Sequence, residues 1–172
     1  MRLKGFVPAV MLAVAGFVGL APLPAAADDD PDFLRLAIGR YDINDNREAI
    51  EFRAEYQSDL KLWIFKPYVG VMATTDGAAY GYAGFVTDFY FGRRIVVTPS
   101  IAAGLYHNGD GKDLGHVVEF RSSIELAYRF DNRSRLGISF YHLSNASLSE
   151  DNQGTEILSL NYSIPLNTGW CN

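Results

Sequence analysis

Three residues near the end of the chain have the types and spacing that nucleophilic ester cleavage requires. His142 and Ser144 are separated by one residue, and Glu156 follows after a stretch rich in turn-forming residues. A serine hydroxyl becomes a useful nucleophile when an imidazole takes its proton, and a carboxylate can hold that imidazole in the correct tautomer. The spacing therefore allows a Ser-His-Glu triad, while polar residues at a strand end can equally be structural.

The elements that would position these residues are β-strands, because apolar and polar residues alternate along most of the chain. Groups of Asn, Asp, Gly and Ser separate the alternating runs and mark turns. We predict eight strands in one domain, over residues 33–42, 47–57, 60–74, 79–91, 93–106, 116–130, 134–144 and 155–166.

Each predicted strand has one apolar and one polar face. In the second strand, Ile50 and Phe52 alternate with Glu51 and Arg53. A soluble lipocalin-like barrel would turn the apolar face inward, whereas a transmembrane barrel turns it toward lipid and pairs the charges inside. The even strand number, the strand lengths and the two long connections at 107–115 and 145–154 favour an all-β, eight-stranded antiparallel transmembrane β-barrel. Side chains fill so narrow a barrel, which argues against transport through it.

The first 27 residues have the features of a secretory signal peptide. Arg2 and Lys4 precede an apolar run, and Ala25-Ala26-Ala27 ends it. We therefore predict a signal peptide over 1–27 and an outer-membrane barrel over 28–172, with 13 basic and 20 acidic residues and a net charge of −7. This acidic balance argues against nucleic acid as a partner. The single cysteine, Cys171, excludes an intramolecular disulfide.

The apolar rows of the last two predicted strands bring the three candidate residues together. The row of the seventh strand runs through Phe140 and continues with His142 and Ser144, while Glu156 opens the row that contains Leu158. Aligning the two rows pairs Phe140 with Leu158 and His142 with Glu156. Directly opposed residues have Cβ atoms about 4.5–5.5 Å apart, close enough for an imidazole–carboxylate hydrogen bond.

The segments His142-Leu143-Ser144-Asn145 and Asn152-Gln153-Gly154-Thr155-Glu156 resemble the signature of the PagL-type lipid A 3-O-deacylases. That signature is H-x-S-N followed by N-x-G-x-E, with the Glu fourteen residues after the His, as here. The resemblance implies that Ser144 is the nucleophile, His142 the base and Glu156 the acid that orients it. It also implies that Asn145 and Asn152 support activity and the oxyanion.

The same resemblance implies a substrate and a location. The substrate would be the acyl chain esterified at the 3-position of lipid A, in the lipopolysaccharide of the outer leaflet, and the partners would be outer-membrane lipids. No metal and no cofactor would be needed. The oligomeric state stays open, a homodimer included.

Other functions and sites stay open from the residues alone. The barrel could be a non-enzymatic scaffold or adhesion protein, a soluble binder, or an acyltransferase that uses another acceptor. The loop at 108–113 faintly resembles a calcium loop, and His107 and His116 flank it, but an ordinary outer loop explains these residues better. Charge pairing inside a narrow barrel explains the polar rows of Asp88, Glu119, Arg121, Glu125 and Arg129.

Overall fold

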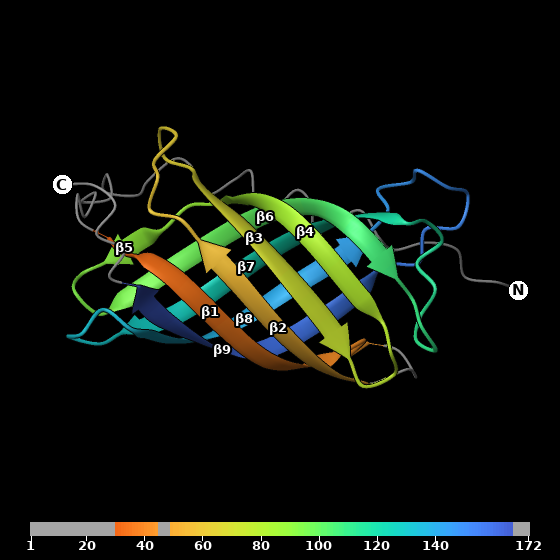
Figure 1. Cartoon of the computed structure of the whole chain (residues 1–172), viewed down its shortest axis with the longest axis horizontal. Helices are drawn as coiled ribbons and strands as arrows, with labels where there is room; N and C mark the ends of the chain where they lie inside the picture. The colour runs from red at the N-terminus through yellow and green to blue at the C-terminus, as the bar shows by residue number, and fades with distance from the viewer. Residues whose placement is uncertain (1–29, 45–48, 167–172) are drawn as a thin grey trace, which may run out of the picture.

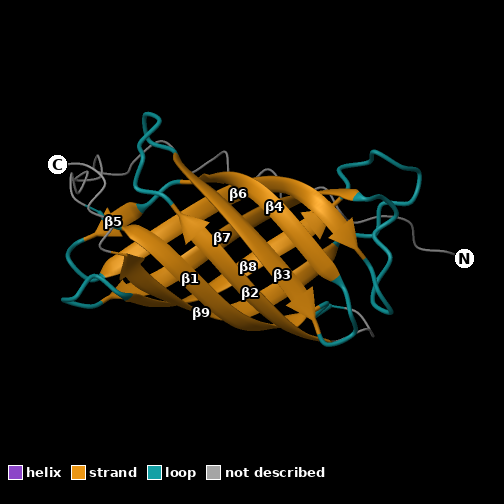
Figure 2. Ribbon diagram, viewed as in Figure 1, coloured by secondary structure: helices purple, strands orange, loops and turns teal. Residues whose placement is uncertain are grey.

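The computed structural model describes residues 30–44 and 49–166. The predicted signal peptide lies outside these ranges, and so does Cys171. All regular elements in the described ranges are strands, joined by loops and turns (Figure 2). No helix in this part of the chain is long and apolar enough to cross a membrane.

The strands form one closed antiparallel sheet (Figure 1). They are β1 (Asp32–Tyr41), β2 (Ala49–Gln57), β3 (Lys66–Thr74), β4 (Ala79–Val86), β5 (Phe89–Phe91), β6 (Ile95–His107), β7 (Val118–Arg129), β8 (Arg135–Ser144) and β9 (Thr155–Leu166). Most strands pair with their neighbours in sequence, β1 pairs with β9, and the pairing of β4 with β6 completes the ring. Both β4 and β5 pair with β6 in the same register, so these two strands share one position in the ring. The nine strands therefore fill eight positions.

The two faces of the sheet have the polarity of a membrane barrel. On β2, Phe52 is 51% exposed, whereas the neighbouring Glu51 is 0% exposed. On β7, Ile124 and Leu126 are likewise exposed, and Glu125 between them is buried. A lipocalin-like barrel would bury the apolar rows instead, so that alternative is wrong. The fold is an eight-stranded antiparallel transmembrane β-barrel, as the sequence predicts.

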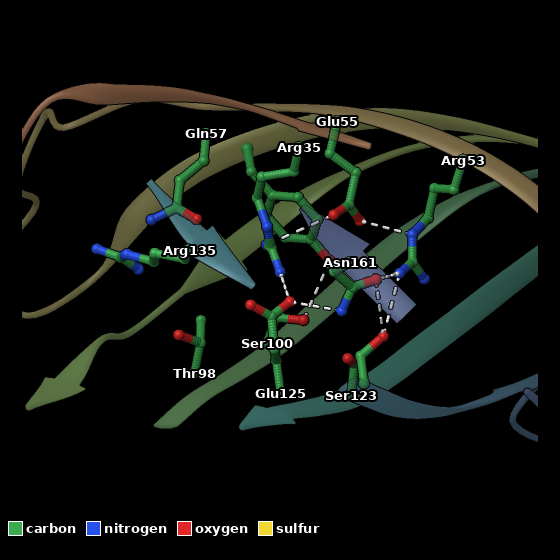
Figure 3. Close-up of polar contacts among 12 residues, drawn as sticks. Arg35, Arg53, Glu55, Gln57, Thr98, Ser100, Ser123, Glu125, Arg135 and Asn161 are labelled. Carbon is green, nitrogen blue, oxygen red and sulfur yellow. Dashed lines mark hydrogen bonds and ion pairs between the residues drawn. The ribbon is translucent and has the colours of Figure 1, made fainter. Parts of the chain in front are cut away.

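Paired charges occupy the middle of the barrel interior (Figure 3). Arg35 forms ion pairs with Glu125 and, at 3.4 Å, with Glu55. Asn161 links this group to Arg53, because its amide donates to Glu125 at 2.8 Å while its carbonyl oxygen accepts from Arg53 at 2.8 Å. Buried charges are tolerated when they are paired and hydrogen-bonded, so this network explains why a charged row can face the interior.

One inward-facing carboxylate differs from this pattern. Glu119 lies on the same strand and face as Glu125 and is also buried. Neither of its carboxylate oxygens has a hydrogen-bond partner in the part of the chain that the structure describes. The interior of the barrel therefore holds both paired and unpaired acidic side chains.

A second group of charges closes the end of the barrel at which β1 begins. Lys66 binds Asp30 at 2.8 Å and Asp88 at 3.1 Å. Arg135 binds the same two carboxylates, Asp88 at 3.0 Å and Asp30 at 3.4 Å. Asp30, which precedes β1, is thereby joined to β3 through Lys66 and to β8 through Arg135.

Two predicted strands differ from the observed ones. The third begins at Lys66 and not at residue 60, because the apolar stretch 60–65 forms a turn that closes with an isolated bridge between Leu62 and Phe65. Trp63 in this turn has a φ of 66° and is 82% exposed. The fourth strand is interrupted after Val86, where the buried Asp88 turns toward Lys66 and Arg135. The predicted start of the second strand at residue 47 lies outside the described residues.

Candidate active site

The hairpin of β8 and β9 carries the candidate residues in the predicted register. Phe140 lies opposite Leu158, and His142 lies opposite Glu156. Phe140 and Leu158 are exposed on the outer wall of the barrel. Since side chains two residues apart on a strand share a face, His142 and Glu156 continue these outward rows. The candidate site therefore lies on the outside of the barrel, at the end where β8 stops.

His142 and Glu156 form a direct contact. His142 Nδ1 is 3.1 Å from Glu156 Oε1, and the two side chains are 26% and 27% exposed. A carboxylate that accepts a hydrogen bond from Nδ1 leaves Nε2 as the nitrogen that can take a proton. The pair thus has the arrangement of an oriented general base.

Ser144 is the last residue of β8, two residues beyond His142 and opposite Phe120 of β7. Its side chain is largely buried. In the described ranges its hydroxyl forms no hydrogen bond. Of the three candidate residues, His142 and Glu156 are therefore in contact, while Ser144 is the neighbour of His142 on β8 without a hydrogen bond to either. Catalytic hydrogen bonds often tighten only when substrate is bound, so this geometry is compatible with a nucleophile that His142 activates.

The chain reverses direction directly after Ser144. Ala146 and Ser147 have φ values of 51° and 67°, in the left-handed region. Asn145 stabilises this turn, because its side-chain oxygen accepts from the Ser147 N–H at 2.9 Å and its backbone oxygen accepts from the Leu148 N–H at 3.0 Å. Asn tolerates such local hydrogen bonding better than most residues, which explains an asparagine at this position.

The amide nitrogen of Asn145 also joins two loops. It donates to the backbone oxygens of Leu114 at 2.9 Å and Asp151 at 2.8 Å, and to Ser149 Oγ at 3.0 Å. The side chain is fully buried. The family resemblance implied that Asn145 supports activity, and the structure adds a role that spacing could not indicate: Asn145 connects the loop before β7 with the loop between β8 and β9.

Asn152, the other predicted support residue, has a different environment. It is exposed, and its amide nitrogen donates to Ser147 Oγ at 3.4 Å. Its donors therefore lie at the surface of the same loop that begins at Ser144.

Asp42, which sequence reasoning missed, supports the strand that carries Glu156. This buried residue has a φ of 58° and accepts hydrogen bonds from Thr155 Oγ1 and Lys112 Nζ, both at 2.8 Å. The next residue, Ile43, donates its N–H to the backbone oxygen of Glu156 at 3.1 Å. The sequence predicted position 42 as the last residue of the first strand, but β1 ends at Tyr41 and Asp42 follows it. No local pattern relates position 42 to position 155.

The histidines around the 108–113 loop have no comparable geometry. His107 is exposed at the end of β6, and His116 Nδ1 accepts from the Val118 N–H at 2.9 Å. Across the described residues, no group of three or more His, Cys, Asp or Glu side chains could hold a metal ion.

Replacing Asn145 by aspartate is expected to loosen both loops. A carboxylate cannot donate to the oxygens of Leu114 and Asp151, and each buried polar group left without a partner costs about 1–3 kcal/mol. Hydrogen exchange should therefore become faster in residues 108–117 and 145–154. Asn152→Asp is the matched control, since Asn152 is exposed, and it should keep the wild-type exchange pattern. Equal protection in Asn145→Asp and wild type would contradict the role of Asn145.

Comparison with solved structures supports the same architecture. The crystal structure of the outer membrane enzyme PagL covers 78% of this chain and 99% of its own, with a TM-score of 0.62 and 22% sequence identity. A de novo designed transmembrane β-barrel covers 84% of this chain and 100% of its own, with a TM-score of 0.51 and 11% identity. At these identities the likeness establishes the fold.

Comparison with sequences identifies the family. No curated protein matches the chain. Residues 46–165 match the family model described as "Lipid A 3-O-deacylase (PagL)". This range extends from just before β2 almost to the end of β9 and includes the whole candidate site. The chain therefore belongs to the PagL family of lipid A 3-O-deacylases.

Proposed function

We propose that this protein is a serine esterase that hydrolyses the acyl ester at the 3-position of lipid A. Ser144 is the nucleophile, His142 the general base, and Glu156 the carboxylate that orients the imidazole. The contact between His142 Nδ1 and Glu156 Oε1 carries the proposal, because it joins two polar residues that continue the apolar outer rows of β8 and β9, and because His142 stands two residues from a serine. Membership of the lipid A deacylase family supplies the substrate.

The first half of the reaction transfers the acyl group to the protein. Ser144 Oγ attacks the ester carbonyl carbon while His142 Nε2 takes the hydroxyl proton. The tetrahedral intermediate then collapses, the bond between the carbonyl carbon and the sugar oxygen breaks, and His142 gives its proton to that oxygen. The products of this step are an acyl-Ser144 ester and a free 3-hydroxyl on the sugar.

The second half restores the enzyme. Water loses a proton to His142 and attacks the acyl-Ser144 carbonyl carbon, and the proton then passes to Ser144 Oγ as the fatty acid leaves. Throughout both halves, Glu156 accepts the hydrogen bond from Nδ1 and stabilises the imidazolium that forms.

The negative charge on the carbonyl oxygen needs hydrogen-bond donors. Asn152 is the side chain that we assign to this role, because its amide is exposed in the loop next to Ser144. Asn145 supports the oxyanion indirectly, since its own amide protons are directed at Leu114, Ser149 and Asp151 and hold the turn after Ser144. In well-studied enzymes, loss of one oxyanion donor costs about 3–4 kcal/mol of transition-state stabilisation.

The proposal includes a location. A signal peptide over 1–27 would export the chain, and residues 28–172 would form the barrel in the outer membrane. With the amino-terminal end of β1 in the periplasm, β8 would end at the outer leaflet. The candidate residues on the outer wall would then lie at the height of the boundary between sugar and acyl chains.

The test is mass spectrometry of lipid A from cells that express the wild type or Ser144→Ala. The wild type should remove one 3-linked hydroxyacyl chain, and Ser144→Ala should leave lipid A intact while the protein still shows the heat-dependent electrophoretic mobility of a folded barrel. Deacylation by Ser144→Ala would refute the assigned nucleophile. Intact lipid A with a folded wild-type barrel in the outer membrane would instead favour a scaffold.

A further inference from the structure

Gly154 lies against the imidazole of His142. A Cβ atom built at position 154 would be 2.4 Å from His142 Cε1, 2.9 Å from Nε2 and 3.4 Å from Nδ1. Real Cβ atoms essentially never approach another heavy atom within 3.0 Å. The ring therefore occupies the space that a side chain at position 154 would need, while its Nδ1 contacts the carboxylate of Glu156.

The backbone conformation does not explain the glycine. Positive φ values occur at Gly77, Gly92, Gly109 and Gly115, where glycine relieves strain in a turn. Gly154 does not share the positive φ of those four glycines. An alanine could adopt its conformation without strain, so the space taken by the imidazole is the constraint at this position.

The backbone at position 154 is also held from both sides. On one side, Thr155 is fully buried and its hydroxyl donates to Asp42 at 2.8 Å. On the other side, the backbone oxygen of Asp151 accepts from Asn145 at 2.8 Å. A side chain added at position 154 would consequently displace the partly exposed imidazole more readily than the backbone.

We infer that Gly154 is a positioning residue that sets the orientation of the His142 ring. The inference rests on the proposed function, in which His142 is the base. Gly154 bounds the ring at Cε1 and Nε2, and Glu156 holds it at Nδ1. A methyl group at position 154 turns the ring away from this arrangement, which lengthens the contact with Glu156 and moves Nε2 relative to Ser144.

The kinetic test compares Gly154→Ala with Gly81→Ala in purified, detergent-solubilised protein. A displacement of about 1 Å at a catalytic group can reduce the rate by about 100-fold, so kcat of Gly154→Ala should fall by about that factor with KM little changed. Gly81 is the matched control, because a Cβ there meets no atom within 4 Å, and its variant should retain wild-type kcat. Wild-type kcat in Gly154→Ala would overturn the inference.

A double-mutant cycle tests the contact without relying on catalysis. Gly154→Ala should lower the urea midpoint of unfolding when His142 is present and leave it unchanged in a His142→Ala background, since the clash is with the ring. An equal decrease of the urea midpoint in both backgrounds would place the clash elsewhere and overturn the inference.

If Ser144→Ala kept its activity, the proposed function would fail, while this cycle would still report whether Gly154 sets the orientation of the His142 ring. If Gly154→Ala failed to fold alone, its recovery in the His142→Ala background would support the inference, and failure there as well would refute it.

Discussion

Replacing His142 by alanine is expected to lower kcat for release of the 3-linked acyl chain by about 10⁶-fold, the loss found when a triad histidine is removed from a well-studied serine hydrolase. In the proposed mechanism, Ser144 then has no base to take its proton. Glu156→Gln should cost less, about 10⁴-fold, because the imidazole remains but its Nδ1 no longer faces a carboxylate. The measurement is fatty-acid release from purified lipid A in detergent micelles.

Two further variants make this result specific. His142→Ala combined with Glu156→Gln should be no slower than His142→Ala alone, because residues that act as a unit are strongly non-additive. His107→Ala removes an exposed imidazole at the end of β6 and should retain wild-type kcat. Additive losses in the double variant would indicate that the carboxylate acts independently of the ring, contrary to the 3.1 Å contact.

Of the variants proposed here, Glu125→Gln is expected to lower the free energy of unfolding the most. Glu125→Gln leaves Arg35 without its ion pair to this position and disturbs the amide of Asn161, which donates to the same oxygen. Removing one member of a buried ion pair typically costs about 3–5 kcal/mol, and the buried charge of Arg35 would keep only its longer ion pair with Glu55, at 3.4 Å. Urea unfolding of the purified barrel, followed by tryptophan fluorescence, measures the free energy of unfolding.

Glu119→Gln is the matched control for this prediction. Both glutamates lie on β7, both face inward and both are buried, but in the described ranges only Glu125 has a partner for its carboxylate. Removing a buried charge that lacks a partner should leave stability unchanged or raise it. A similar loss in both variants would show that burial, and not pairing, determines the cost.

The sequence predicted most of the barrel because its pattern has a period of two. A shift of one residue would turn an apolar row such as that of Phe140 to the opposite face, so the register of β8 and β9 is strongly specified. The prediction of a strand over 60–65 is wrong because these residues, apart from Lys61, are as apolar as a lipid-facing strand. Their turn at Trp63 depends on a positive φ that composition does not indicate. The interruption at Asp88 depends on its interior partners, Lys66 and Arg135.

Only those parts of the candidate site that belong to one hairpin could be predicted from the sequence. His142 and Glu156 belong to one hairpin, so aligning two apolar rows was enough to pair them. The hydrogen bonds from Asn145 to Leu114, and from Thr155 to Asp42, join parts of the chain that no pairing rule relates. Spacing alone likewise gives no sign that Gly154 borders the imidazole.

The position of the candidate site on the outer wall, with paired charges filling the interior, has a kinetic consequence. Because the interior of the barrel is filled and the candidate site lies outside it, a lipid substrate of the proposed reaction would arrive by lateral diffusion in the surrounding layer of lipid or detergent. The encounter is then two-dimensional, and the relevant substrate concentration is a surface density. Adding inert lipid or detergent at a fixed amount of substrate would lower the surface density of the substrate, whereas changing the volume of the solution would leave that density unchanged.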